Sequence, residues 1–152
     1  MLANLKTVAF PLFGDSRGKL VVLQEFSPFV PFQIRRAFFI FDTTPGTVRG
    51  SHAHYKNRQM LICVSGACTI KCELPDGTKS SYRLDWPDKG VLVEGLVWHT
   101  MEEFYKDAVL LVLASELYDE ADYIRDYAEF KCLASGQPAN GNAEGEAEVC
   151  RT

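Results

Sequence analysis

The sequence predicts an all-β fold, a single sandwich or barrel, and three observations support this prediction. Short apolar segments alternate with clusters of Gly, Pro, Asp and Ser along most of the chain. The segment "ACTIKCEL" alternates apolar and polar residues, which is typical of a strand with one wet face. With 152 residues, of which 47% are hydrophobic, the chain can bury one core but is too short for two ordinary domains.

Seven segments are expected to form strands. In chain order they are residues 19–26, 34–43, 58–66, 67–74, 80–86, 90–95 and 108–115. Asp76 and Gly77 predict a tight hairpin turn, because both tolerate a positive φ. Residues 108–115 are apolar throughout, which indicates a strand covered on both faces.

The pattern changes after the last of these strands. Tyr123 and Tyr127 are four residues apart and Asp119 is a suitable N-cap, so residues 117–130 predict a short helix. The segment 132–152 is rich in Gly, Ala, Asn and Glu and has little to bury, which predicts a disordered, low-complexity tail. We therefore expect one domain over residues 1–131 and a tail over 132–152.

Composition argues against several functional classes. A net charge of −4 without a Lys or Arg run gives no footprint for nucleic acid or a membrane surface. No segment approaches the roughly 18 apolar residues that span a bilayer, and we expect no membrane association. Five scattered cysteines, Cys63, Cys68, Cys72, Cys132 and Cys150, form no disulfide framework. Reduced thiols predict a cytoplasmic protein. Cys68 and Cys72 alternate in step with Ile70 and Leu74, which predicts that both are small core residues.

Two histidines in "GSHAHYKNRQM" are the strongest candidates for chemistry. If the chain is extended there, His52 and His54 point to the same face. Such a pair can hold a metal, move protons or simply pack.

The spacing around this pair resembles the first motif of the cupins, which are small β-barrels or jelly rolls. The match runs from Gly46 through His52 and His54 to Gln59 and Gly66. Many cupins bind a divalent metal through two histidines, a glutamate and a later histidine. Here the amide of Gln59 stands in the carboxylate position, and amides are poorer ligands. His99 comes two positions earlier than the second motif places it. Metal-free proton transfer by neutral imidazoles is therefore favoured.

Longer segments resemble one cupin branch, the sugar 3,4-ketoisomerases or WxcM-like enzymes. The resemblance covers about residues 5 to 130 and is carried by "RGSHAH", "LVWH", and "LVLAS" followed by "YDEADYIRDY". These enzymes act on dTDP-4-keto-6-deoxyglucose. The resemblance implies a cupin-type jelly-roll barrel, a dTDP-linked 4-keto-6-deoxyhexose as the partner and assembly as a homodimer. It also implies that no metal or redox cofactor is needed.

The resemblance further implies roles for individual residues. His52 is the expected base for the proton on carbon 3, and His54 either carries protons between the sugar oxygens or stabilises the intermediate. Arg17 and Arg49 resemble positions near the substrate, where a guanidinium suits a diphosphate. Gln59 and His99 are the other expected substrate-binding residues, and Arg17 and His99 are expected to govern stereochemistry at carbon 4.

Some questions stay open at this point. Many relatives have a tyrosine where this chain has Phe38, so the proton donor at that position is not assigned. The resemblance implies a dTDP-3-keto-6-deoxyhexose product for the deoxy-amino sugars of lipopolysaccharide or S-layer glycans, and leaves its gluco or galacto configuration open. A dTDP-4-keto-6-deoxyhexose epimerase and a non-catalytic small-molecule-binding cupin are the competing hypotheses.

Overall fold

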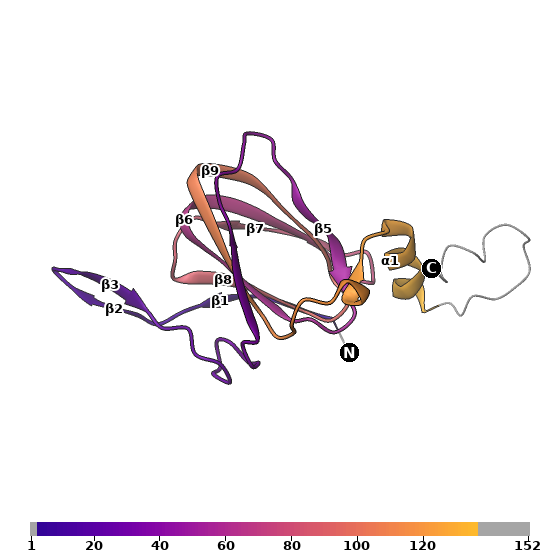
Figure 1. The fold of residues 1–152 in the computed structure, drawn as a ribbon, viewed down its shortest axis with the longest axis horizontal. Coiled ribbons are helices and arrows are strands. Elements are labelled where there is room, and N and C mark those ends of the chain that lie inside the picture. The colour runs from indigo at the N-terminus through magenta and orange to yellow at the C-terminus, as the bar shows by residue number, and fades with distance from the viewer. Residues whose placement is uncertain (1–2, 137–152) are drawn as a thin grey trace, which may run out of the picture.

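Antiparallel strands make up most of the computed structural model, which describes residues 3–136 (Figure 1). Their bounds are β1 Asn4–Ala9, β2 Leu12–Asp15, β3 Gly18–Val21, β4 Arg36–Ile40, β5 Arg49–His54, β6 Gln59–Glu73, β7 Lys79–Leu84, β8 Lys89–Glu94, β9 Trp98–Ala114 and β10 Tyr123–Ile124. Within these residues one sheet has the order β1-β8-β6-β9-β5-β10, with β4 joined to β9 and β7 to β6. The predicted all-β fold is confirmed.

The two longest strands, β6 and β9, pair with each other along most of their length. Their register shifts between Cys63 and Thr69, which marks a bulged bend in both strands. Gly66 lies at this bend, where an added Cβ would come within 2.4 Å of the Lys106 carbonyl oxygen. The bend explains why residues 58–66 and 67–74 are parts of one strand, although the Ser-Gly pair between them predicts a break.

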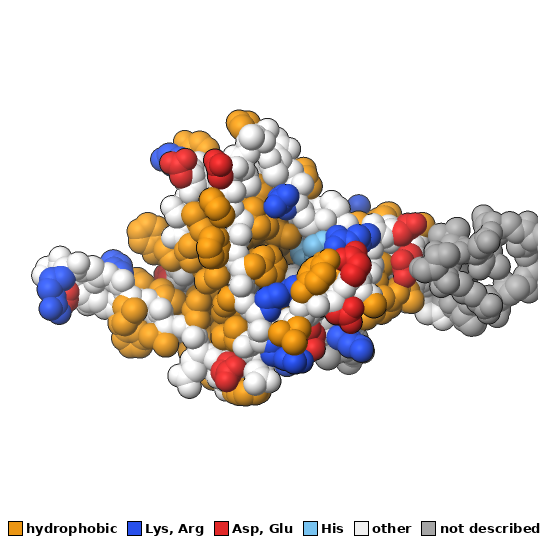
Figure 2. Space-filling view, viewed as in Figure 1, with side chains coloured by type: hydrophobic (Ala, Val, Ile, Leu, Met, Phe, Trp, Pro, Cys, Tyr) orange, Lys and Arg blue, Asp and Glu red, His pale blue; other side chains and the backbone are white. Residues whose placement is uncertain are grey.

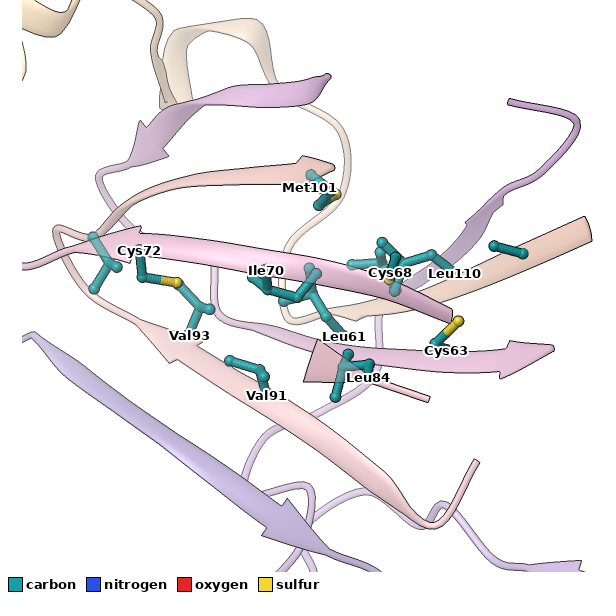
Figure 3. Close-up of a cluster of buried hydrophobic side chains, with 13 residues drawn as sticks. Leu61, Cys63, Cys68, Ile70, Cys72, Leu84, Val91, Val93, Met101 and Leu110 are labelled. Carbon is teal, nitrogen blue, oxygen red and sulfur yellow. The ribbon is translucent and has the colours of Figure 1, made fainter. Parts of the chain in front are cut away.

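Side chains alternate between two apolar clusters across β6. Leu61, Cys68, Ile70 and Cys72 belong to the larger cluster. Figure 3 shows this cluster between facing strands. Met60 and Ile62 point the other way, into a second cluster. Cys68 and Cys72 are 0% and 4% exposed, so their predicted place in the core is confirmed.

The predicted hairpin turn at Asp76 and Gly77 joins β6 to β7. The Asp76 carboxylate accepts a hydrogen bond from the Thr78 backbone N–H at 2.8 Å, and the Leu74 N–H donates to the Thr78 carbonyl at 2.9 Å. These bonds close the turn and set the register in which Glu73 pairs with Lys79.

The chain between residues 117 and 130 does not form the continuous helix that the sequence predicts. Asp119 caps a single 3-10 turn, η1 (Glu120–Asp122), and the chain then extends as β10 along β5. The α-helix α1 (Tyr127–Ser135) begins only after Asp126, whose carboxylate accepts hydrogen bonds from two backbone N–H groups. Pairing with β5 and complete burial of Ile124 favour the extended conformation over the helix.

In the N-terminal region the predicted strand over residues 19–26 is confirmed only in part, as β3, whereas β1 and β2 are strands that the sequence analysis did not predict. β1 pairs with β8, while β2 and β3 form a separate hairpin that projects from the barrel on the side away from α1 (Figure 1). At the other end, α1 continues past residue 131 to Ser135. The predicted tail beyond residue 136 lies outside the described residues. No described helix has the length and apolar character to cross a bilayer.

Candidate active site

The candidate site is built on β5, where a bulge places two histidines next to each other. The register between β5 and β9 shifts between Gly50 and His52, and Ser51 and Gly50 both have positive φ values, 57° and 82°. The rings of His52 and His54 lie 4.9 Å apart between centroids, at 80° to each other. The prediction that both imidazoles share one face is confirmed. Figure 2 shows imidazole atoms in a hollow bordered by basic and apolar side chains.

His54 is held at both ring nitrogens. Its Nδ1 lies 3.0 Å from the Asp122 carboxylate, and its Nε2 lies 3.3 Å from Gln59 Nε2. Asp122 also accepts hydrogen bonds from the backbone N–H groups of Lys56, at 2.7 Å, and Asn57, at 3.1 Å. A carboxylate only accepts, so the proton of the neutral His54 ring belongs on Nδ1.

His99 lies directly across the sheet from His52. The two residues are partners in the β5–β9 pairing, and their ring centroids are 4.8 Å apart. His99 is 0% exposed, and its Nδ1 donates to the Val97 carbonyl at 3.2 Å. Its Nε2 has no hydrogen-bond partner among the described residues. His99, which the resemblance implies is a substrate-binding residue, therefore lies beside the histidine pair.

Burial keeps all three imidazoles neutral at physiological pH. Loss of solvation lowers the pKa of His52 and of His54 to about 4, and that of His99 to about 3. A neighbouring imidazole is the second cause in each case: His54 acts on His52, His99 on His54, and His52 on His99. A neutral imidazole has a basic nitrogen, and the unpartnered nitrogens of the cluster are Nδ1 of His52 and Nε2 of His99 among the described residues.

An aromatic and charged rim surrounds the histidines. The Tyr123 ring lies 5.0 Å from the His52 ring and 4.4 Å from the His54 ring, between centroids. Arg125 stacks over Tyr123 at 4.4 Å and pairs with Glu120. On β4, Phe38 packs against the larger apolar cluster rather than offering a hydroxyl group.

The two predicted arginines lie at different places. Arg49 is exposed at the start of β5, three residues before His52. Arg17 lies at the tip of the β2–β3 hairpin, where it pairs with Asp15 and is 88% exposed. Because that hairpin projects away from the barrel (Figure 1), Arg17 does not reach the histidines of its own chain.

The donor set does not fit a divalent metal. Among the described residues no group of three or more His, Cys, Asp or Glu side chains is arranged to hold a metal ion. In the position of the cupin carboxylate, Gln59 presents an amide nitrogen to His54, and the other nitrogen of His54 is held by Asp122. We therefore derive no catalytic step through a metal.

Asp122 and Tyr123 are the site residues that sequence reasoning missed. Asp122 stands in "YDEAD", where its acidic neighbours indicate the first turn of a helix. Only the pairing of β10 with β5 brings it to His54, which is 68 positions away in the chain. No local signal in the sequence points to this contact.

Comparison with known proteins places the chain in a family. The model of the WxcM-like C-terminal family, FdtA, matches residues 3–135. This chain belongs to the WxcM-like family. A relative from Aneurinibacillus thermoaerophilus, a TDP-4-oxo-6-deoxy-alpha-D-glucose-3,4-oxoisomerase, is 45% identical over 127 residues, which are 83% of this chain and 89% of that protein.

Solved structures of two 3,4-ketoisomerases and of a sugar epimerase have the same fold. A variant of the 3,4-ketoisomerase QdtA from Thermoanaerobacterium thermosaccharolyticum, in complex with TDP-4-keto-6-deoxyglucose, is 36% identical, with a TM-score of 0.83 over 89% of this chain and 96% of that chain. The TDP-quinovose 3,4-ketoisomerase WlaRB from Campylobacter jejuni is 41% identical, with a TM-score of 0.79 over 84% and 97%. The 4-keto-6-deoxy sugar epimerase NovW from Streptomyces spheroides, 22% identical with a TM-score of 0.67 over 78% and 67%, shares the fold alone.

Proposed function

We propose that this protein is a sugar-nucleotide 3,4-ketoisomerase, an intramolecular oxidoreductase that moves the keto group of dTDP-4-keto-6-deoxyglucose from carbon 4 to carbon 3. The observation that carries the proposal is the pair of buried, neutral imidazoles, His52 and His54, in a chain whose relatives are named for this reaction. The product is a dTDP-3-keto-6-deoxyhexose that serves deoxy-amino-sugar synthesis.

In the proposed first step, His52 takes the proton from carbon 3. The electrons of the broken C–H bond form a double bond between carbons 3 and 4, and the oxygen on carbon 4 becomes an enediolate oxygen. His52 suits this role because its neutral ring has a free lone pair, and the bulge in β5 fixes its position. His52 then returns a proton to carbon 4.

In the proposed second role, His54 moves the hydroxyl proton from the oxygen on carbon 3 to the oxygen on carbon 4. Asp122 supports this role, because it fixes the ring and the tautomer of His54 while remaining an acceptor. The exchange leaves carbon 3 as the ketone and carbon 4 as the alcohol. Hydrogen and electrons balance within the sugar, so the reaction as written needs no metal and no redox cofactor.

The proposal includes a homodimer in which the hairpin of one copy carries Arg17 to the site of the other. The support is the projection of that hairpin and its exposed apolar side chains: Leu12, Phe13 and Leu20 are 41%, 55% and 58% exposed. An isolated two-stranded hairpin is only marginally stable in water, so a second copy is a suitable cover. Arg17 and the exposed Arg49 are proposed to bind the diphosphate, with Arg17 and His99 governing stereochemistry at carbon 4.

The test is incubation of the protein with TDP-4-keto-6-deoxyglucose, followed by ¹³C NMR of the sugar. We expect the ketone signal to move from carbon 4 to carbon 3. An unchanged ketone position with an inverted neighbouring carbon identifies an epimerase instead. Tight binding of TDP without any change in the sugar identifies a non-catalytic binding protein. A cytoplasmic location and the use of the product in lipopolysaccharide or S-layer glycans remain predictions.

A further inference from the structure

Gln59 occupies an unusual environment beside the proposed proton carrier. It is the first residue of β6, is 3% exposed, and has its amide nitrogen 3.3 Å from His54 Nε2. Its other polar atom, Oε1, is buried without a hydrogen-bond partner among the described residues. A buried oxygen without a hydrogen-bond partner is destabilising and uncommon in folded proteins.

The contacts of His54 define which of its nitrogens changes protonation. Nδ1 faces the Asp122 carboxylate at 3.0 Å and keeps its proton in both the neutral and the charged ring. The proton that comes and goes is therefore the one on Nε2, the atom that faces Gln59. In the neutral ring Nε2 accepts a hydrogen bond, whereas in the charged ring it must donate one.

We propose that Gln59 is the positioning residue that allows His54 to gain and lose a proton, by rotating its amide so that Oε1 accepts from the protonated Nε2. In the neutral state the amide N–H₂ group donates to Nε2. After the rotation the unpartnered Oε1 takes the same place, so each state of His54 has a matching partner. The catalytic meaning of this exchange rests on the proposed function, but the exchange itself is a property of the ligand-free protein.

An amide suits this place better than other side chains of similar size. A carboxylate at position 59 would favour the charged ring and hold the proton on His54. An apolar side chain would leave the N–H of the charged ring unpaired. Only the amide offers a donor and an acceptor at the same reach.

Other groups around His54 set the background against which Gln59 acts. The groups that face it from the neighbouring elements are His52 of β5, His99 of β9, Arg36 of β4, Asp122 of η1 and Tyr123 of β10. Burial, His99 and Arg36 lower the pKa of His54, while Asp122 raises it. None of these side chains has a hydrogen bond to Nε2, whereas the Gln59 amide does. A change at position 59 therefore acts on that nitrogen directly.

The test is an NMR titration of His54 in the ligand-free protein and in two variants. Gln59→Glu is expected to raise the pKa of His54 by about 1–3 units, because a carboxylate then faces Nε2. Gln59→Met is expected to lower it, because the charged ring loses its acceptor. Turnover is expected to fall at least roughly tenfold in both variants, while the Kd for TDP changes less than about threefold. Gln33→Glu, the same change at an exposed position, is the matched control and is expected to leave the pKa of His54 and the turnover unchanged.

A second measurement uses the parent protein alone, so it does not depend on the folding of any variant. In the parent protein, the side-chain ¹⁵N and ¹H signals of Gln59 should shift with the same midpoint as the ring signals of His54. The proposal is overturned if these signals do not follow His54, or if the pKa of His54 is the same in all variants. It is also overturned if the variants only weaken TDP binding, which would make Gln59 a substrate ligand. The titrations need no turnover, so they stand or fall independently of the ketoisomerase assignment.

Discussion

His54 owes its orientation to one carboxylate that also holds the neighbouring backbone. Asp122 accepts hydrogen bonds from the His54 ring and from the N–H groups of Lys56 and Asn57. These bonds fix the chain that follows β5 as well as the imidazole. A side chain of the same size that lacks the charge would hold His54 less firmly and would no longer require a proton on Nδ1.

Asp122→Asn is therefore expected to lower turnover by about 100-fold or more while leaving TDP binding close to that of the parent. Loss of hydrogen bonds to a charged acceptor should also lower the free energy of unfolding by about 1–3 kcal/mol. Steady-state kinetics and urea unfolding measure the two effects.

Asp126→Asn is the matched control for this variant. Asp126 caps α1, and asparagine caps helices as well as aspartate does, so turnover and stability should stay near those of the parent. Equal turnover in the two variants would show that Asp122 does not position a catalytic group.

The pH dependence tests the electrostatics of the histidine pair. Because the pKa of His52 is lowered to about 4, the ring stays unprotonated well below the usual midpoint near 6.5. We expect kcat/KM to be level from pH 8 to about 5.5 and to fall only as pH approaches about 4. Half of the activity lost near pH 6.5, with the fold intact by circular dichroism, would contradict the buried environment of His52.

The same shifts affect stability with a definite sign. The unfolded chain binds protons on its histidines near pH 6.5, whereas the folded chain does so only near pH 4 for His52 and His54. The unfolded state therefore takes up more protons between these values. The free energy of unfolding should decrease as pH falls through this window.

At the residue scale, the sequence predicts contacts between near neighbours and misses distant ones. Strand alternation predicts that His52 and His54 share a face, and the resemblance to the cupin motif adds Gln59 to the pair. His99 is identified because it follows a second recognisable segment. Asp122 joins the site only through the pairing of β10 with β5, so its role becomes visible with the fold.

At the element scale, the bulge in β5 positions His52. Gly50 adopts a φ of +82°, and an added Cβ would lie 2.9 Å from the His99 carbonyl oxygen. Only glycine combines this conformation with such a close approach between β5 and β9.

Gly50→Ala is expected to destabilise the protein by about 1–3 kcal/mol and to lower turnover, because β5 must move away from β9. Urea unfolding and steady-state kinetics are the measurements. Gly77→Ala is the control, because Gly77 has a φ of +85° but no neighbour within 4 Å of its added Cβ. Gly77→Ala should lower the free energy of unfolding through backbone strain but leave turnover unchanged. Equal losses of turnover in both variants would argue against a positioning role for the bulge.

The strands were predictable where apolar residues alternate or cluster, as in β7 and β8. The prediction of a helix over residues 117–130 is wrong, because acidic caps and tyrosine spacing fit a helix as well as they fit the observed turn and strand. The edge of β5 offers backbone hydrogen-bond partners to Tyr123 and Ile124. The stabilisation from this long-range pairing outweighs the local preference for a helix. Polar residues in the first half of β9 concealed its start at Trp98.

At the scale of the whole molecule, the projecting hairpin predicts that each site needs two chains. Arg17→Ala and His52→Asn should each have low activity alone. Coexpressed in equal amounts, they should recover about a quarter of the parent activity, because half of the dimers are mixed and each has one intact site. Sedimentation velocity checks that dimers form. No recovery in mixed dimers would show that Arg17 does not serve the site of the second chain.

The proposed reaction depends on His52, which moves a proton at carbon 3 and thereby moves the ketone. The most direct measurement is NMR of TDP-4-keto-6-deoxyglucose incubated in deuterated water with the parent protein and with His52→Asn, after TDP binding has been shown for both. We expect a 3-keto product carrying deuterium at carbon 4 with the parent, and neither product nor deuterium with the variant. Undiminished turnover by His52→Asn, or deuterium exchange by the parent without migration of the ketone, would contradict it.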